Sequence, residues 1–291
     1  MRAARVPERF AAYPLLFPSW LAVVLVAFFP LFAVFLWSFF QYLPAQGVFE
    51  SAGAQHYQRL LGDERFWQAL GNTAYVSIVS VALELVLGLS LAMLLHERLP
   101  GRGWFRAAVL VPWAIPTVVS ARLWEWMLNA DYGLVNYLLG SSENWLGTPG
   151  LAMHAVIAAD VWKTTPFAAL LLLAGLQVIP EDLYQAARTD GADAWRRFWH
   201  ITLPLLRPML LVVLLFRTLD AFRIFDVVYV LTGGGPANTT ETLSVYAYKT
   251  YFQILDFGYG SALSVVVFLC VGALSAVYLR LWTRRTAEGT E

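Results

Sequence analysis

The chain has 291 residues, of which 59% are hydrophobic, 15% are aromatic and only 14% are charged. Soluble domains average roughly 45–50% apolar residues, so this composition indicates a protein of the lipid bilayer. The 20 basic and 20 acidic side chains give a formal net charge of zero, which argues against a nucleic-acid-binding protein, and the single cysteine excludes an internal disulfide.

Six apolar segments are long enough to cross a bilayer as helices, each of which needs about 20 residues. The first run follows several arginines, but it is too long for a signal peptide and has no small-residue cleavage site, so we expect it to be retained. The predicted spans cover residues 20–40, 71–95, 107–128, 151–179, 209–231 and 258–282. The sequence therefore predicts an all-α polytopic membrane protein, with a short cytoplasmic segment (1–13) before a transmembrane domain (14–291).

Basic residues favour alternate connections, and short basic connections stay in the cytoplasm. If the N-terminus is cytoplasmic, the inner segments hold 13 arginines and the outer loops hold only Arg59, Arg65 and Lys249. This bias predicts that both termini are cytoplasmic. The connection between spans four and five, residues 180–208, then also faces the cytoplasm.

This connection is unusually polar for a segment between two apolar runs. Pro180 suits the first position of a short helix and Gly191 suits its end. A second helix is predicted over residues 192–201, lying along the membrane interface, with Pro204 and Pro208 ending it before the chain re-enters the bilayer.

The residues of this connection form a recognisable motif. "YQAARTDGADAWRRFWHITLPLLRP" resembles the cytoplasmic signature loop of inner-membrane permeases from binding-protein-dependent ABC importers, although Gln185 stands where that family usually has Glu. "FDVVYVLTGGGPANTTETL", "VWKTTPF" and "LQVIPEDLY" resemble sugar permeases of the maltose and glycerol-3-phosphate class, in particular the first of the two maltose-type permeases. The likeness extends from about residue 72 to the C-terminus.

The resemblance implies a mechanical role for the connection, as a coupling helix seated in a cleft of an ATP-binding subunit. It assigns this contact to Glu181, Gln185, Ala186, Ala187, Asp190 and Gly191. The sequence has no G-x-x-x-x-G-K-[ST] phosphate-binding loop, so we expect no enzyme activity and no cofactor in this chain, with ATP and Mg bound by a partner. The implied partners are a second, related permease subunit, two ATP-binding-cassette subunits and an external sugar-binding protein, in the cytoplasmic (inner) membrane of a bacterium or archaeon.

Charged side chains inside the predicted spans are costly, about 2.5 to 3.5 kcal/mol each at a helix centre, so they need a reason. Most form close opposite pairs along the sequence: Arg122 with Glu125, Asp160 with Lys163, Arg217 with Asp220, and Arg223 with Asp226. Glu84 has no such local partner. We expect it to face the interior and pair with an arginine on a neighbouring span.

In related maltose-type permeases, spans equivalent to the fourth and fifth hold the sugar near mid-membrane. Carried over by the resemblance, the substrate positions are Asp160, Lys163, Thr164 and Phe167, and Arg217, Asp220, Ala221 and Ile224. Each set is spaced i, i+3, i+4, i+7, which is one face of a helix. The alternative, that these charges only hold helices together, stays open, and it is favoured for the Arg122–Glu125 pair.

The resemblance thus implies a permease subunit that forms half of the pathway of an ATP-driven sugar importer, most simply for a neutral disaccharide such as maltose or trehalose. A glycerol-3-phosphate-type permease remains an alternative. So does an ion-coupled carrier, which would use an unpaired membrane carboxylate such as Glu84 as a proton site. A membrane glycosyltransferase or hydrolase is disfavoured, because the four histidines have no metal-ligand spacing and no G-x-S-x-G elbow is present.

Overall fold

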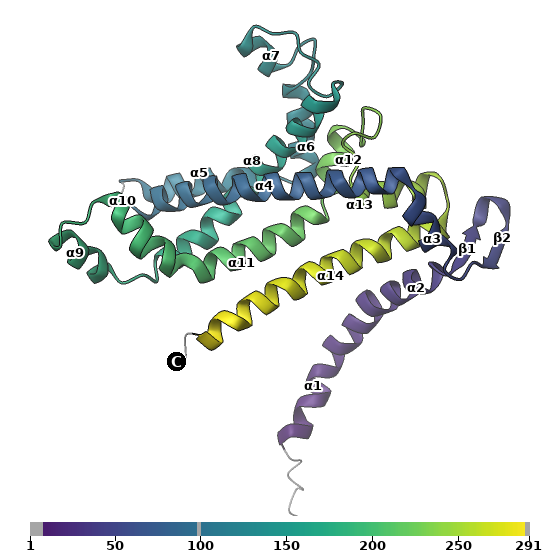
Figure 1. Cartoon of the computed structure of the whole chain (residues 1–291), viewed down its shortest axis with the longest axis horizontal. Helices are drawn as coiled ribbons and strands as arrows, with labels where there is room; N and C mark the ends of the chain where they lie inside the picture. The colour runs from purple at the N-terminus through teal and green to yellow at the C-terminus, as the bar shows by residue number, and fades with distance from the viewer. Residues whose placement is uncertain (1–7, 98–99, 289–291) are drawn as a thin grey trace, which may run out of the picture. The chain divides into compact units, whose positions relative to one another are not determined.

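The structure is a computed structural model that describes residues 8–97 and 100–288 (Figure 1). Most of the predicted 1–13 segment, with Arg2 and Arg5, lies outside the described residues, as does Arg98. The chain divides into two compact units: residues 1–63 with 247–266, and residues 64–246 with 267–291.

Five described helices are long and apolar enough to cross a membrane, and a bent pair makes a sixth if it counts as one span. This outcome confirms the predicted all-α polytopic fold. The long helices are Leu16–Trp37, Glu64–His96, Pro149–Leu176, Ala194–Phe222 and Phe257–Arg280, and the bent pair is Gly103–Ala114 with Thr117–Met127.

The first unit begins with α1 (Glu8–Val23), which runs through a π-helical turn (Val24–Phe28) into α2 (Phe29–Trp37). A small antiparallel hairpin follows, β1 (Phe40–Leu43) with β2 (Val48–Ser51), joined through Pro44–Gln46 and by Gly47 at φ +66°. Apolar patterning did not predict the hairpin or α3 (Gln55–Gly62). The unit also contains the π-helical turn Lys249–Gln253 and the start of α14 (Phe257–Glu288).

The second unit is built around α4 (Glu64–His96), α8 (Pro149–Leu176) and α11 (Leu203–Phe222). Small side chains let α4 and α8 approach closely: a Cβ placed on Gly88 would lie 3.0 Å from the Cβ of Ala168. Close approach through small residues is the usual way in which helices pack in a bilayer. It brings polar residues of the two helices, one turn away, into direct contact.

The predicted third span is not one straight helix, which corrects the expectation for residues 107–128. It consists of α5 (Arg102–Ala114) and α6 (Thr117–Met127), bent by 90°. Pro116 explains the break, because the residue before a proline avoids the helical region, and Ile115 is extended at ψ 133°. Beyond α6 the chain forms the short helix α7 (Leu134–Leu139), in which Asn136 donates to two main-chain carbonyls and accepts from Ser141 and Trp145.

The connection over residues 180–208 contains the predicted first helix, α9 (Glu181–Thr189), preceded by Pro180 as its N-cap rather than as its first residue. Its end is a Schellman motif: Ala192 N–H donates to Ala187 O at 2.8 Å, and Gly191 N–H donates to Arg188 O at 3.1 Å. Gly191 has φ +78°, a conformation that glycine adopts without strain.

The predicted second helix does not stop at the prolines. The helix α10 (Ala194–Arg197) passes through a π-helical turn (Phe198–Thr202) into α11, and together they form one helix of 29 residues. Pro204 follows the π-helical turn directly, at the point where the hydrogen-bond ladder changes from π to α, so its missing N–H falls at a place where the ladder is already irregular. Pro208 lies inside α11, as prolines of membrane helices can when neighbouring groups satisfy the freed carbonyl.

The predicted fifth span, 209–231, is also interrupted. The helix α11 ends at Phe222, and a separate short helix, α12 (Asp226–Leu231), follows. Asp226 therefore does not lie on the same helix as Arg217 and Asp220. The glycine-rich loop after α12 leads to α13 (Leu243–Tyr248), and the Thr73 hydroxyl of α4 accepts the Leu243 N–H at 2.9 Å.

Candidate functional site

A cavity of about 930 Å³ lies within the second unit. Five segments form its wall: the α5–α6 break, α8, α11, the α11–α12 break and one residue of α14. The lining comprises Trp113, Ala114, Ile115, Pro116, Thr117, Asp160, Lys163, Thr164, Phe167, Phe216, Arg217, Leu219, Asp220, Arg223, Ile224, Phe225, Asp226, Val227 and Val271. A cavity of this size accommodates an organic ligand of several hundred daltons.

The lining contains all but one of the residues that the sequence suggested as substrate positions: Asp160, Lys163, Thr164, Phe167, Arg217, Asp220 and Ile224. The exception is Ala221, which is buried and lies outside the lining. The helical spacing of the two sets explains why α8 and α11 present them together. Their role in binding stays a prediction.

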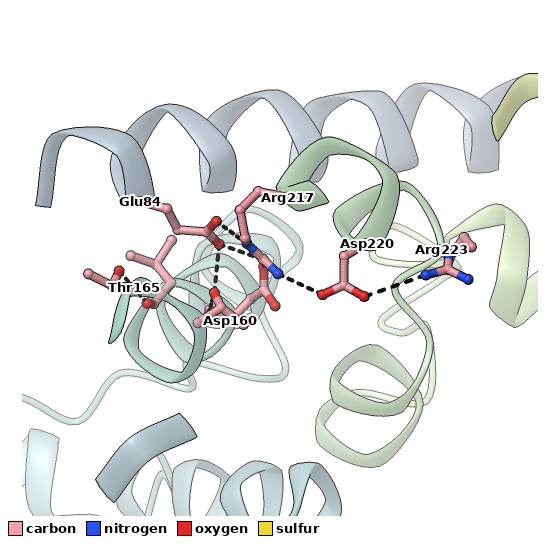
Figure 2. A network of polar contacts seen from close by, with 8 residues as sticks. Glu84, Asp160, Thr165, Arg217, Asp220 and Arg223 are labelled. Atoms are coloured by element: carbon pink, nitrogen blue, oxygen red, sulfur yellow. Dashed lines mark hydrogen bonds and ion pairs between the residues drawn. The ribbon is translucent and has the colours of Figure 1, made fainter. Parts of the chain in front are cut away.

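Arg217 is the centre of a buried network that joins three helices (Figure 2). Its Nε donates to Glu84 Oε2 at 2.5 Å and its Nη2 donates to Glu84 Oε1 at 2.8 Å, which is a two-bond, fork-shaped pair. Its Nη1 donates to Asp220 Oδ2 at 2.6 Å. The predicted pairing of Glu84 with an arginine on a neighbouring span is confirmed, as is the Arg217–Asp220 pair.

Two buried acidic side chains, Glu84 and Asp160, lie beside this one arginine. Glu84 is fully buried and receives a third hydrogen bond, from Thr164 Oγ1 at 2.7 Å. Asp160 is further away, with 3.7 Å between its Oδ2 and Arg217 Nη2. Within the described part of the chain, Asp160 Oδ2 is buried and has no hydrogen-bond partner. Both oxygens of Glu84 therefore accept hydrogen bonds, whereas Asp160 Oδ2 accepts none within the described residues.

Lys163 does not pair with Asp160 as the sequence suggested. Its Nζ donates to Ile115 O at 2.5 Å and lies 3.5 Å from Trp113 O. Both carbonyls belong to the end of α5, where the break leaves main-chain acceptors without helical partners. A lysine at this place stabilises the end of the helix, and the side chain is drawn away from the carboxylate three residues before it.

The remaining predicted pairs differ in their surroundings. Arg122 and Glu125 do pair, at 2.5 Å, and both are well exposed, outside the cavity lining. Arg223 pairs with Asp220, at 3.8 Å, in place of Asp226, because α11 ends at Phe222 and Asp226 begins the separate helix α12. Arg223 also donates to Leu219 O at 3.2 Å.

Several lining residues were missed by sequence reasoning. Trp113 stacks on Phe167, with ring centroids 5.9 Å apart, and Phe216 and Phe225 add apolar wall. The signal that could have found Trp113 is Pro116 within an apolar run, which favours a broken helix. A broken helix inside a membrane is tolerated where it lines a cavity.

The residues that the resemblance assigned to coupling lie on or next to α9. Glu181, Gln185, Ala186, Asp190 and Gly191 are exposed, and Ala187 is half-buried. Tyr184 anchors α9 to the long helix that follows, through a hydrogen bond of 3.0 Å between its hydroxyl and Thr202 Oγ1. The arrangement presents one face of a short, fixed helix outward.

Comparison with known proteins places these features in one family. The family model described as "Binding-protein-dependent transport system inner membrane component" matches residues 84–287. The trehalose/maltose transport system permease protein MalF of Thermococcus litoralis is 53% identical over 233 residues, covering 79% of each chain. The trehalose transport system permease protein SugA of Mycobacterium tuberculosis is 41% identical over 280 residues, covering 96% of this chain and 91% of its own. The sulfoquinovosyl glycerol transport system permease protein SmoG of Agrobacterium fabrum is 38% identical over 279 residues, covering 94% and 91%.

Solved structures agree on the fold. A chain in the crystal structure of a bacterial alginate ABC transporter, in complex with alginate pentasaccharide-bound periplasmic protein, matches with a TM-score of 0.82 at 23% identity and covers 96% of both chains. The MetNI methionine ABC transporter matches with a TM-score of 0.56 at 21% identity over 75% of this chain and 94% of its own. The protein belongs to the family of binding-protein-dependent transport system inner membrane components.

Proposed function

We propose that this chain is one of two permease subunits of an ATP-driven importer for a neutral sugar, most simply a disaccharide such as maltose or trehalose. The names of two of its relatives support a sugar of this kind. The third relative is named for a sulfonated sugar, so kinship alone does not decide the charge of the substrate. The residues that line the cavity favour a neutral substrate.

The observation that carries the proposal is that the cationic side chains of the lining are already engaged. Lys163 binds the carbonyls at the end of α5, Arg217 binds Glu84 and Asp220, and Arg223 binds Asp220 and Leu219 O. An anionic ligand that approached Arg217 would have to displace the buried Glu84, which is costly, and one that approached the exposed Arg223 would meet the Asp220 carboxylate beside it. A neutral ligand only needs acceptors for its hydroxyl groups.

The cavity offers such acceptors together with apolar wall. Asp160 lines the cavity, and its buried Oδ2 accepts no hydrogen bond within the described part of the chain; Asp226 is an exposed acid of the lining. The stacked Trp113 and Phe167 suit the apolar face of a sugar ring. Carboxylates accept hydrogen bonds from hydroxyl groups, and this combination favours a polyhydroxyl ligand over a sugar phosphate.

The proposal also includes the coupling of ATP hydrolysis to transport. In it α9 seats in a cleft of an ATP-binding-cassette subunit through Glu181, Gln185, Ala186, Ala187, Asp190 and Gly191, and two such subunits bind ATP and Mg. An external sugar-binding protein delivers the substrate. A second permease completes the pathway, and the first span, whose side chains are exposed in this chain, supplies apolar surface for lipid or that partner.

The structure gives little support to the alternative of an ion-coupled carrier, which the sequence left open. Such a carrier needs a membrane carboxylate that can gain and lose a proton. Glu84, the residue considered for this role, receives two hydrogen bonds from Arg217 and one from Thr164. Glu84 is therefore not the unpaired carboxylate that such a carrier would use.

The test is to purify the tagged chain from its native membrane, identify its partners by mass spectrometry, and reconstitute the complex in liposomes. We expect an ATPase and a second permease to accompany it, and ATP-dependent uptake of labelled trehalose or maltose that excess sugar phosphate does not inhibit. Uptake without ATP would instead support a carrier. Uptake that prefers the sugar phosphate would support the glycerol-3-phosphate-type alternative.

A further inference from the structure

We propose that Glu84 is a positioning residue that holds Arg217 away from Asp160, and thereby keeps the Asp160 carboxylate available to a sugar hydroxyl. Glu84 lies outside both the cavity lining and the substrate positions suggested by the sequence. The inference rests on the proposed function of the cavity and adds a residue that determines which groups the cavity offers.

The first step is the geometry of the guanidinium. Its Nε and Nη2 are directed to Glu84 and its Nη1 to Asp220, so both edges of the group are used (Figure 2). The distance of 3.7 Å from Nη2 to Asp160 Oδ2 is too long for a hydrogen bond. Asp160 is near enough to attract Arg217, and Glu84 holds the contact that Asp160 would otherwise make.

The second step is that Glu84 itself is fixed. Thr164 Oγ1 donates to Glu84 Oε1 at 2.7 Å from the opposite helix. One turn further along α4, Gly88 packs against Ala168 of α8, where there is no room for even a methyl group without a shift. The carboxylate of Glu84 therefore has a single place in the helix pair, and the fork of Arg217 is oriented by it.

The third step concerns Asp160. A buried carboxylate oxygen without a hydrogen-bond donor is unfavourable, and Asp160 Oδ2 is such an oxygen in the described part of the chain. Asp160 lines the cavity, so a ligand donor approaches its carboxylate from that side, while Oδ2 itself is buried beside Arg217. If Glu84 lost its charge, a small rotation of the guanidinium would bring Arg217 onto Asp160, and the acceptor would be lost to the ligand.

The experiment replaces Glu84 by Gln in the complete, reconstituted transporter and measures how many neutral disaccharide molecules are imported for each ATP hydrolysed. We expect this ratio to fall about tenfold, the effect of one lost hydrogen bond to a charged group. ATPase activity stimulated by the sugar-loaded binding protein should stay within about twofold of wild type. A purely structural role would lower assembly and ATPase activity together.

Three further variants make the test specific. Glu84→Asp keeps the charge and should restore much of the ratio. Glu125→Gln removes the acid of the exposed Arg122–Glu125 pair and should leave the ratio unchanged. The double variant Glu84→Gln with Arg217→Gln removes the competitor for Asp160 as well, and should import more sugar per ATP than Glu84→Gln alone.

A wild-type ratio in Glu84→Gln would overturn the inference. So would a double variant no better than the single one, or a loss of assembly in both, since the network would then be only structural. The proposed function fails separately, if the wild-type transporter imports no neutral sugar at all.

Discussion

Arg217 sets the charge balance of the buried network. It is 3% exposed and lies between Glu84 and Asp160, which are buried, and Asp220, which is largely exposed. One acid can be neutralised and the arginine still has a buried partner. Without the arginine, two buried acids face each other, which is the more costly change.

We therefore predict that Arg217→Gln destabilises the assembled protein by about 3 to 5 kcal/mol, the usual effect of breaking a buried ion pair. The measurement is thermal unfolding of the detergent-purified complex. The matched control is Arg122→Gln, because Arg122 also pairs with an acid three residues on but is 64% exposed. Its effect should stay below about 1 kcal/mol. Equal stability of the two variants would contradict the prediction.

At this scale, residue spacing predicted some contacts and missed others for physical reasons. Arg217–Asp220 and Arg122–Glu125 pair because i and i+3 are neighbours on a helix. Asp160 and Lys163 have the same spacing, but Lys163 instead binds main-chain carbonyls that exist only because another helix breaks nearby. Sequence gives no direct sign of such acceptors.

Among the elements, the prolines behaved in opposite ways. Pro116 breaks the third span, whereas Pro204 and Pro208 are absorbed into the helix that leads into the fifth. The difference lies in the backbone around each proline: the helix containing Pro204 widens into a π-helical turn just before it, whereas Ile115 becomes extended. Composition alone therefore predicted the number of spans but not their straightness.

The Schellman motif at the end of α9 depends on the backbone conformation of Gly191. Gly191 has φ +78°, whereas proline fixes φ near −65°, so Gly191→Pro should unwind the end of α9. If α9 couples the permease to its ATPase, we expect the variant to insert normally but to lose most sugar uptake, at least about tenfold, while ATPase activity persists without coupling.

The control is Gly191→Asn, because asparagine tolerates this left-handed conformation better than other residues. It should couple nearly as well as wild type. Sugar uptake per ATP in both variants, with membrane insertion checked by detergent extraction, decides the point. Normal coupling in Gly191→Pro would remove α9 from the proposed mechanism.

For the whole molecule, apolar length and the matched family agree on a multi-span inner-membrane permease. The resemblance led directly to the cavity residues on α8 and α11, because helical spacing carries a face over from one relative to another. Two features could be recognised only from the three-dimensional structure: the part of the cavity wall formed by the α5–α6 break, and the contact of the fully buried Glu84 with Arg217. Neither feature corresponds to a motif with a fixed residue spacing in the sequence.

The orientation of the chain in the membrane, predicted from its basic residues, can be tested by labelling single cysteines. With Cys270 replaced by Ser, a single cysteine at Tyr137, which is 83% exposed on α7, should react with a membrane-impermeant maleimide in intact cells. A single cysteine at the exposed Arg188 on α9 should react only after the membrane is opened. The reverse pattern would invert the predicted topology.

The breaks at 113–117 and 223–227 have a consequence for how such a permease evolves. Both place the ends of helices in the cavity wall, where peptide N–H and C=O groups lie outside the regular helical ladder. A point mutation replaces a side chain but leaves these peptide groups in place. Part of the polarity of the wall is thus inherited unchanged, and a new specificity can arise from a few side-chain substitutions against a constant background of main-chain polarity.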